Sequence, residues 1–252
     1  MSTALPPATD VIVVGAGNAA FCAALAAAEQ GVSVLMLERA PEAEAGGNSR
    51  FTAGAFRCVY NGVDDLRALM PDLTDEEVAT SDFGTYTEEK FFDDMGRVTE
   101  YRTDPDLCEI LVTRSKATML WMRDKGVRFM PIWGRQAYKI GGRFKFWGGL
   151  TVEAWGGGPG LVEAWTRIAR KNNVQIAYGA RALSLIADDD GVKGVRIRSA
   201  AEFRPALEAA IKSNKPTVID VAMINNPTPT SGHWNILDIY SPGKHVSHAA
   251  VD

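Results

Sequence analysis

The clearest alternation of apolar and polar segments in the chain lies between Asp10 and Arg39, DVIVVGAGNAAFCAALAAAEQGVSVLMLER. An apolar run at Val11–Val14 is followed by a glycine-containing turn, an alanine-rich segment and a second apolar run that ends at Glu38. Short apolar runs on either side of a longer helix-forming segment are typical of a strand, a helix and a second strand. The pattern therefore predicts a βαβ unit at the start of the chain.

The turn inside this unit carries small residues at a specific spacing, with Gly15, Gly17 and Ala20 in the three positions. A pyrophosphate group binds backbone N–H groups at a helix N-terminus, and glycine lets the backbone turn tightly and approach it. Glu38 ends the second apolar run, where the dinucleotide fingerprint has an acid that accepts from a ribose hydroxyl. The spacing predicts dinucleotide binding, with a non-binding βαβ unit as the alternative, and leaves FAD or NAD open.

Residues 64–126 are polar and carry helix-capping signals. Thr74 and Glu77 have capping-box spacing, Pro105 suits the first turn of a longer helix, and Gly126 suits its end. Apolar residues recur at helical spacing along that longer helix and predict a buried stripe. The predicted stripe consists of Leu107, Ile110, Leu111, Ala117, Leu120 and Trp121.

Further elements follow in the second half of the chain. An amphipathic helix is predicted at Leu161–Lys171 and a strand at Val174–Tyr178. Two more strands, Ala182–Ala187 and Val192–Ile197, flank an Asp-Gly sequence, which is a strong signal for a β-hairpin. The fold class predicted from these segments is α/β.

Composition narrows the class of protein. The 252 residues carry a net charge of −4 without a run of Lys or Arg, which argues against nucleic acid or an anionic membrane as the main partner. Three scattered cysteines do not suggest a disulfide framework or a zinc site. The N-terminus lacks the pattern of a signal peptide, and no long apolar stretch is present. We expect a cytoplasmic protein without a bound metal or membrane insertion.

Two later segments are candidates for ligand binding. Residues 46–55, GGNSRFTAGA, are small or carry hydroxyl groups, which suits either a second backbone cradle for a ligand or a glycine-rich surface loop. Residues 129–158 combine aromatic residues with cations that could bind carboxylates or could simply face solvent. The candidate cations are Arg135, Lys139, Arg143 and Lys145.

With ERAPEAEAGGNSRFTAGAFR following the fingerprint, residues 9–197 resemble the flavoprotein subunits of succinate dehydrogenases and fumarate reductases, and within that family tricarballylate dehydrogenase-like enzymes. The resemblance implies a Rossmann-like FAD-binding domain of the glutathione-reductase type with a β-meander, here truncated. It favours FAD over a nicotinamide nucleotide.

The resemblance also implies roles for individual residues. Residues 46–49 would lie over the pyrophosphate and ribityl chain, residues 52–54 beside the isoalloxazine ring, and the backbone of Ala182 at the adenine. The cofactor-binding residues implied are Gly15, Gly17, Asn18, Ala19, Ala20, Glu38, Arg39, Gly46, Gly47, Asn48, Ser49, Thr52, Ala53, Gly54 and Ala182. Because no histidine lies near the glycine-rich loop, non-covalent FAD is expected.

The implied reaction is hydride transfer between flavin N5 and the Cα–Cβ bond of a polycarboxylate. Arg135 and Arg143 are the substrate candidates, and the expected partners are a small carboxylate and an electron acceptor. The catalytic arginine and the substrate-binding histidines of the family cannot be mapped, so the catalytic residues are unknown. A chimeric or truncated FAD-binding fragment without activity is the alternative.

The resemblance to flavoproteins ends near Ser199. We therefore predict an incomplete FAD-binding domain at 1–198 and a tail of different origin at 199–252. The tail resembles the C-terminal end of thiamine-diphosphate-dependent decarboxylases and carboligases. A helix is predicted at Ala201–Lys212 and a strand at Pro216–Met223. A thiamine-type lyase component is a minor alternative, because the chain has no G-D-G motif for the metal.

Overall fold

The structure is a computed structural model that describes residues 8–146, 149–189 and 191–199, which belong to a compact unit spanning Met1–Glu202. The helix and the strand predicted for the tail lie outside the described residues, as do the three histidines, His233, His245 and His248.

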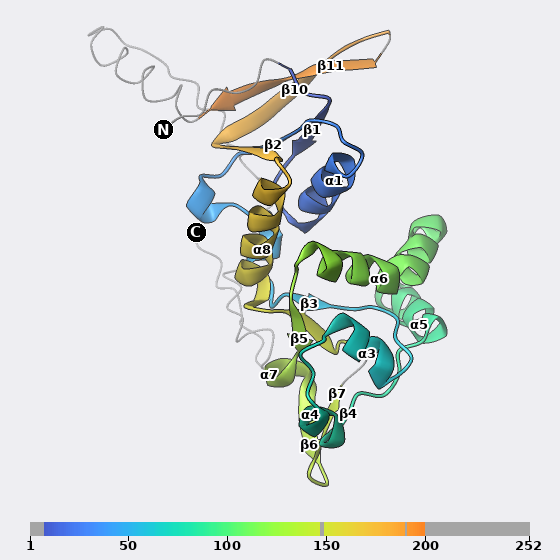
Figure 1. Ribbon diagram of the computed structural model, residues 1–252. Coiled ribbons are helices and arrows are strands. Elements are labelled where there is room, and N and C mark those ends of the chain that lie inside the picture. Colours follow the sequence, from blue (N-terminus) through green and yellow to red (C-terminus); the bar gives the residue numbers. More distant parts are fainter. Residues whose placement is uncertain (1–7, 147–148, 190, 200–252) are drawn as a thin grey trace, which may run out of the picture. The chain divides into compact units, whose positions relative to one another are not determined.

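The regular structure begins with the predicted βαβ unit. Strand β1 (Val11–Val14) leads through helix α1 (Asn18–Ala28) to strand β2 (Val34–Glu38), and the two strands pair in parallel. Strand β9 (Gln175–Tyr178) pairs in parallel with the other side of β2, so the sheet has the order β1-β2-β9. Figure 1 labels β1, α1 and β2 in the upper part of the view. Every residue of β2 is buried, as expected for a central strand of a parallel sheet.

Two helices bury their apolar faces in one core beside this sheet. Helix α1 contributes Phe21 and Leu25, and helix α8 (Gly157–Lys171) packs against α1 and contributes Trp165 and Ile168. Burying apolar side chains of this size is the main favourable contribution to the stability of such a layer. Both α1 and α8 therefore stabilise the part of the structure that carries the fingerprint turn.

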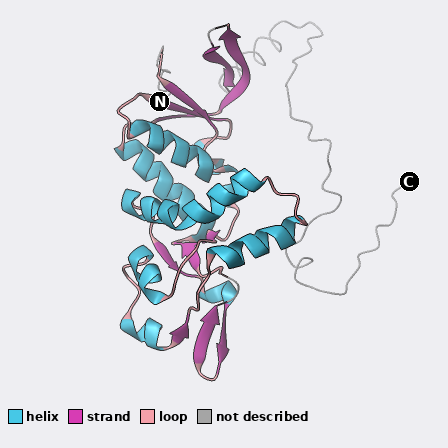
Figure 2. Ribbon diagram, turned by 90° about the vertical axis from the view of Figure 1, so that its right-hand side faces the viewer, coloured by secondary structure: helices cyan, strands magenta, loops and turns pink. Residues whose placement is uncertain are grey.

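The predicted hairpin near the end of the described chain is confirmed, with longer strands than expected. Strand β10 (Ala180–Asp188) pairs antiparallel with β11 (Gly191–Ser199), and the pair is one of the magenta hairpins in Figure 2. Ala180 packs on Leu35 and Leu37 of β2, which fixes the hairpin to the parallel sheet.

A second small sheet follows the glycine-rich loop. After the 3₁₀ helix η1 (Glu42–Glu44) and helix α2 (Gly47–Arg50), strand β3 (Ala55–Phe56) pairs antiparallel with β8 (Val152–Ala154), which pairs antiparallel with β5 (Phe129–Pro131). The loop at 46–54 therefore runs from the parallel sheet to the β3-β8-β5 sheet.

The segment 63–125 is mainly helical, as predicted. Its elements are α3 (Val63–Leu69), α4 (Asp75–Ala79), β4 (Ser81–Asp82), α5 (Glu88–Thr99) and α6 (Pro105–Lys125). The caps predicted from sequence are confirmed: Thr74 and Glu77 form a capping box, Pro105 opens α6, and Gly126 ends it in the left-handed conformation.

The stripe predicted to be buried along α6 is wrong. Leu107, Ile110 and Leu111 are 65%, 58% and 48% exposed, Ala117 is also exposed, and only the last two of the six residues, Leu120 and Trp121, are packed against the core. The buried face consists instead of Cys108, Val112, Ser115, Met119 and Met122. Both sets have helical spacing, because apolar residues occur around most of the helix. The choice between them comes from packing against α3 and α5.

The aromatic-rich segment forms a third sheet. Helix α7 (Trp133–Gln136) leads into β6 (Ala137–Ile140) and β7 (Arg143–Phe146), which form a hairpin, and β7 pairs in parallel with β4. This hairpin is the second one drawn in magenta in Figure 2. Phe146 of β7 stacks on Phe83, and the Trp133 ring packs against both at a tilt. Aromatic packing thus accounts for much of the aromatic content of this segment.

Candidate functional site

The fingerprint turn has the geometry of an anion-binding helix N-terminus. Gly15 has φ +106°, a value that L side chains rarely adopt, and its N–H donates to the carbonyl of Leu37 at 2.8 Å. Gly17 stands at the N-cap of α1 and offers no side chain to cap it. Among the described residues, no acceptor takes the N–H of Ala19 or Ala20. The first turn of α1 thus presents unpaired donors and the positive end of its dipole.

Glu38 lies at the end of β2 with its carboxylate turned to this same turn. The side chain is 7% exposed; Oε2 accepts from the N–H of Ala16 and Oε1 from the N–H of Ala40, each at 2.8 Å. A carboxylate has about four lone-pair sites, so each oxygen can accept one further hydrogen bond. The held carboxylate suits a ribose with free hydroxyl groups and disfavours a phosphorylated one.

The glycine-rich loop approaches the start of α1 closely. Ser49 Oγ accepts from the N–H of Asn18 at 3.0 Å, and a Cβ on Gly17 would lie 3.5 Å from that oxygen. Gly46 and Gly54 have φ +118° and +72°, and a Cβ on Gly46 would lie 2.7 Å from Val162. The backbone of the loop needs glycine at these positions, which supports the interpretation as a cradle over that of a plain surface loop.

The start of α8 holds the far end of this loop. Gly158 donates from its N–H to the carbonyl of Thr52 at 3.1 Å, and the N–H of Ala154 donates to the carbonyl of Gly54 at 2.8 Å. A Cβ on Gly158 would lie 2.3 Å from the carbonyl oxygen of Ser49. The backbone of the helix and that of the loop are therefore in direct contact.

This contact also corrects the predicted start of the helix. The predicted helix starts at Leu161, whereas α8 begins at Gly157 and includes three glycines and a proline in its first turn. Glycine is a poor helix former, and the close approach to the loop compensates for it. Sequence reasoning missed the supporting role of this segment, although its density of glycines directly before an amphipathic helix was the available signal.

Three of the four candidate cations have partners in the β6–β7 hairpin or in the neighbouring strand β4. Arg143 donates to the carbonyl of Ser81 at 2.7 Å, Lys145 pairs with Asp82 at 3.2 Å, and Lys139 lies 5.1 Å from the centre of the Phe144 ring. The contacts of Arg143 and Lys145 use part of their hydrogen-bonding capacity, and the Lys139 ammonium group lies over an aromatic ring of the same hairpin.

Arg135 has a different neighbour. Burial raises the pKa of Glu153, and the charge of Arg135 offsets part of that rise. Glu153 lies in β8 directly opposite Ala55 of β3, the strand that follows the glycine-rich loop. Of the four cations, Arg135 is thus linked electrostatically to the sheet that continues the cradle, and Arg143 is linked to β4.

Two other predicted residues lie at the same parallel sheet. Ala182 is half-buried in β10, next to the part of the strand that packs on β2. Arg39 is exposed directly after Glu38. The structure thus places the residues predicted for the adenosine end along β2 and β10, and those predicted for the flavin end along the loop that leads to β3.

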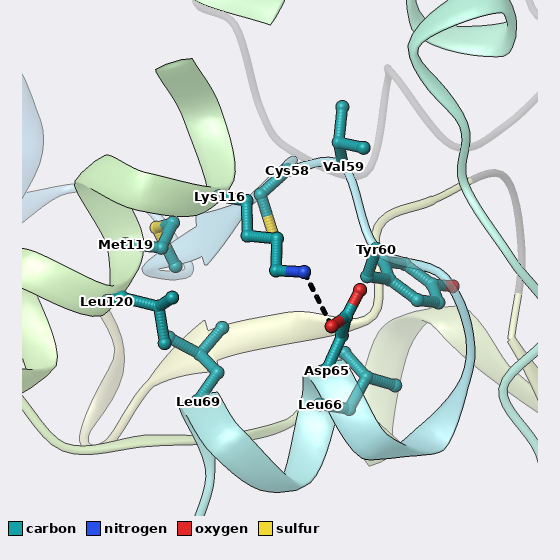
Figure 3. Close-up of a pocket in the computed structure, with 9 residues that line it drawn as sticks. All are labelled: Cys58, Val59, Tyr60, Asp65, Leu66, Leu69, Lys116, Met119 and Leu120. Atoms are coloured by element: carbon teal, nitrogen blue, oxygen red, sulfur yellow. Dashed lines mark hydrogen bonds and ion pairs between the residues drawn. The ribbon is translucent and has the colours of Figure 1, made fainter. Parts of the chain in front are cut away.

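A small cavity lies between α3 and α6 (Figure 3), and no residue of the cradle lines it. Its lining includes Cys58, Met119 and the Lys116–Asp65 ion pair, and its volume of about 10 Å³ leaves room for at most a water molecule. Burial raises the pKa of the Cys58 thiol to about 11, which suits a structural and unreactive cysteine. The cavity offers no cofactor site.

The geometry defines the class of protein as a dinucleotide-binding protein with a Rossmann-like domain. The family model of the FAD binding domain matches residues 10–233. The chain belongs to this family of FAD-binding proteins, and its cofactor is FAD. The match continues beyond Ile197, where the resemblance seen in the sequence ends.

Known relatives confirm the resemblance to fumarate reductase flavoproteins. The chain is 27% identical over 190 residues to a fumarate reductase (cytochrome) of Shewanella frigidimarina, which covers 75% of the chain and 29% of the relative. It is 29% identical to a vinyl phenol reductase of Lactiplantibacillus plantarum, covering 80% of the chain and 36% of the relative. The chain thus spans about a third or less of the length of these relatives.

Solved structures agree with this assignment. The open conformation of a flavocytochrome c3 fumarate reductase matches with a TM-score of 0.54 and 25% identity, over 76% of this chain and 30% of that one. A 3-ketosteroid-Δ4-(5α)-dehydrogenase from Rhodococcus jostii RHA1 shares the fold with a TM-score of 0.57 and 22% identity, over 76% and 42% of the two chains.

Within the described ranges, no group of three potential metal-ligating side chains comes together. The helices in that part of the chain are all too short or too polar to cross a bilayer.

Proposed function

We propose that this chain forms the FAD-binding part of an oxidoreductase that transfers hydrogen across the Cα–Cβ bond of a polycarboxylate. The observation that supports this proposal is the uncapped start of α1, which contacts the glycine-rich loop through Asn18 and Ser49, with the Glu38 carboxylate bound to the N–H of Ala16 in the same turn. FAD, when bound, would supply a hydride acceptor and donor at its isoalloxazine ring. The chain's own residues would bind and orient that cofactor.

The roles of the residues follow from their positions. The N–H groups of the first turn of α1 would bind the pyrophosphate, the Glu38 carboxylate the ribose, and the backbone of residues 52–54 would lie along the flavin. Arg135 is the preferred carboxylate-binding cation, because Glu153 links it to the strand after the cradle. An electron acceptor would complete the reaction. We propose non-covalent attachment, since the three histidines lie at 233, 245 and 248, far along the chain from the cradle.

A second candidate function is FAD binding without turnover. It is favoured by the coverage of the relatives, since the chain matches only 29% of the fumarate reductase and 36% of the vinyl phenol reductase. In this case the cradle described above would be intact, and substrate-binding residues would have to come from elsewhere.

The visible spectrum of the purified full chain tests these proposals. We expect a yellow protein with flavin absorption bands. Tricarballylate should bleach the flavin by reducing it, and fumarate should reoxidise flavin that a reduced dye has first reduced. Yellow protein that responds to neither carboxylate would favour FAD binding without turnover. Colourless protein that takes up no added FAD would contradict both.

The choice between the two arginines has its own test. We expect Arg135→Gln to raise the KM for fumarate by about tenfold or more, because a charge-assisted hydrogen bond to a carboxylate is lost. Arg143→Gln is the matched variant, and its effect should be below about threefold, since Arg143 already donates to the carbonyl of Ser81. Equal effects of the two variants would contradict the preference for Arg135, and unchanged FAD content in both would show that the cradle is intact.

A further inference from the structure

One buried side chain of α8 reaches the start of α1. Trp165 is 0% exposed, and its Nε1–H donates to Oδ1 of Asn18 at 2.7 Å. Asn18 is the first residue of α1, and its own backbone N–H donates to Ser49 of the glycine-rich loop. Asn18 is thus the residue at which α8, α1 and the loop meet.

This hydrogen bond determines where the side-chain oxygen of Asn18 points relative to the unpaired N–H groups of α1. The side-chain oxygen of an asparagine can accept from backbone N–H groups one or two residues away. Here the only acceptor atom of the Asn18 side chain is directed to Trp165. The N–H groups of Ala19 and Ala20 remain without an acceptor among the described residues.

We propose that Trp165 is a positioning residue for the FAD pyrophosphate, because it holds the side-chain oxygen of Asn18 away from the N–H donors of α1. Without this hydrogen bond, Asn18 would compete with the pyrophosphate for those donors. The inference rests on FAD binding at α1, which the proposed function also requires.

A neighbouring, partly buried indole makes its hydrogen bond at the other end of α1. Trp121 of α6 lies against Trp165 with ring centres 5.9 Å apart, yet its Nε1–H donates to Glu29 at the other end of α1. The chain therefore contains two adjacent tryptophans, each bound to α1 through its N–H, and only one of them at the cofactor end. Trp121→Phe is a matched control for Trp165→Phe.

The test measures the dissociation constants of FAD and ADP for the full chain, together with the melting temperature of the FAD-free protein. Trp165→Phe should raise both dissociation constants by about tenfold. The freed Asn18 oxygen would accept a backbone N–H of α1, and the pyrophosphate would lose that charge-assisted hydrogen bond. Trp121→Phe should leave both constants unchanged. An equal effect of the two variants, or none from Trp165→Phe, would overturn the inference.

The Asn18→Ala variant separates positioning from packing. It removes the competing oxygen, and the FAD dissociation constant of this variant is the reference for the double variant; the unpaired indole N–H should lower the melting temperature. In the Asn18→Ala background, Trp165→Phe should no longer weaken FAD binding. If its effect persists there at full size, Trp165 acts through packing and the inference fails.

A measurement on the wild type covers the case in which Trp165→Phe does not fold. The indole N–H of Trp165 should be protected from hydrogen exchange in ¹⁵N-labelled protein, both without and with FAD. Loss of that protection on binding FAD would overturn the inference while leaving FAD binding itself established. A wild-type chain that binds neither FAD nor ADP would overturn the proposed function as well.

Discussion

Glu38→Ala is expected to lower the free energy of unfolding by about 2 to 4 kcal/mol and to weaken FAD binding more than about tenfold. The carboxylate accepts the N–H groups of Ala16 and Ala40, and Ala16 is fully buried. Truncation leaves both donors without their carboxylate acceptor and removes the group that we propose binds the ribose. Chemical denaturation and FAD titration of the full chain measure the two effects.

The control is a carboxylate at the opposite end of the same strand pair. Asp10 accepts from the N–H of Ser33 at 2.8 Å and from its hydroxyl at 2.6 Å, but it is exposed to solvent. Because water can replace the lost acceptor, Asp10→Ala should cost less than about 1 kcal/mol and leave FAD affinity unchanged. Glu38→Gln keeps one acceptor oxygen and should fall in between. A loss in Asp10→Ala as large as that in Glu38→Ala would contradict this account.

Gly158→Ala is expected to lower the free energy of unfolding by about 1 to 3 kcal/mol, the range found for inserting an extra carbon into a packed interior. The new Cβ would meet the carbonyl oxygens of Ser49 and Thr52 at 2.3 and 2.6 Å. Backbone atoms cannot move away by a change of rotamer, so α8 and the loop must separate. The displaced loop should also bind FAD more weakly.

Gly134→Ala is the matched control for this substitution. Gly134 is also helical and has ordinary backbone angles, and nothing lies within 4 Å of a Cβ built on it. The alanine should therefore be neutral or stabilise by up to about 1 kcal/mol. Thermal unfolding of the two variants, measured under the same conditions, compares the two changes in stability. A Gly158→Ala protein as stable as Gly134→Ala would show that the contact between α8 and the loop is not needed.

Local features of the fold could be predicted well from the sequence. The capping box at Thr74, the helix start at Pro105 and the helix end at Gly126 all occur as expected. Each depends on hydrogen bonds and backbone angles within a few residues, so the residue types carry the information themselves. The βαβ unit was predictable for a related reason, since its glycine turn and its two apolar strands have a fixed order.

Features that depend on distant partners could not be predicted in this way. The buried face of α6 differs from the predicted one, because either face has helical spacing and only α3 and α5 distinguish them. The partners of Arg143 and Lys145 are likewise residues of β4, about 60 positions earlier in the chain. Spacing along the sequence contains no information on such contacts.

The fingerprint shows both sides of this division. The sequence by itself determined a glycine turn between a strand and a helix, followed by an acid at the end of the next strand. These features depend on residues close together in the chain and occur in a fixed order, so the residue types alone reveal them. Only the tertiary structure decided that Gly158 and Trp165, some 140 residues later, hold the loop and Asn18 at that turn. The reason is physical, since a close backbone approach and a buried hydrogen bond exist only once α8 packs on α1.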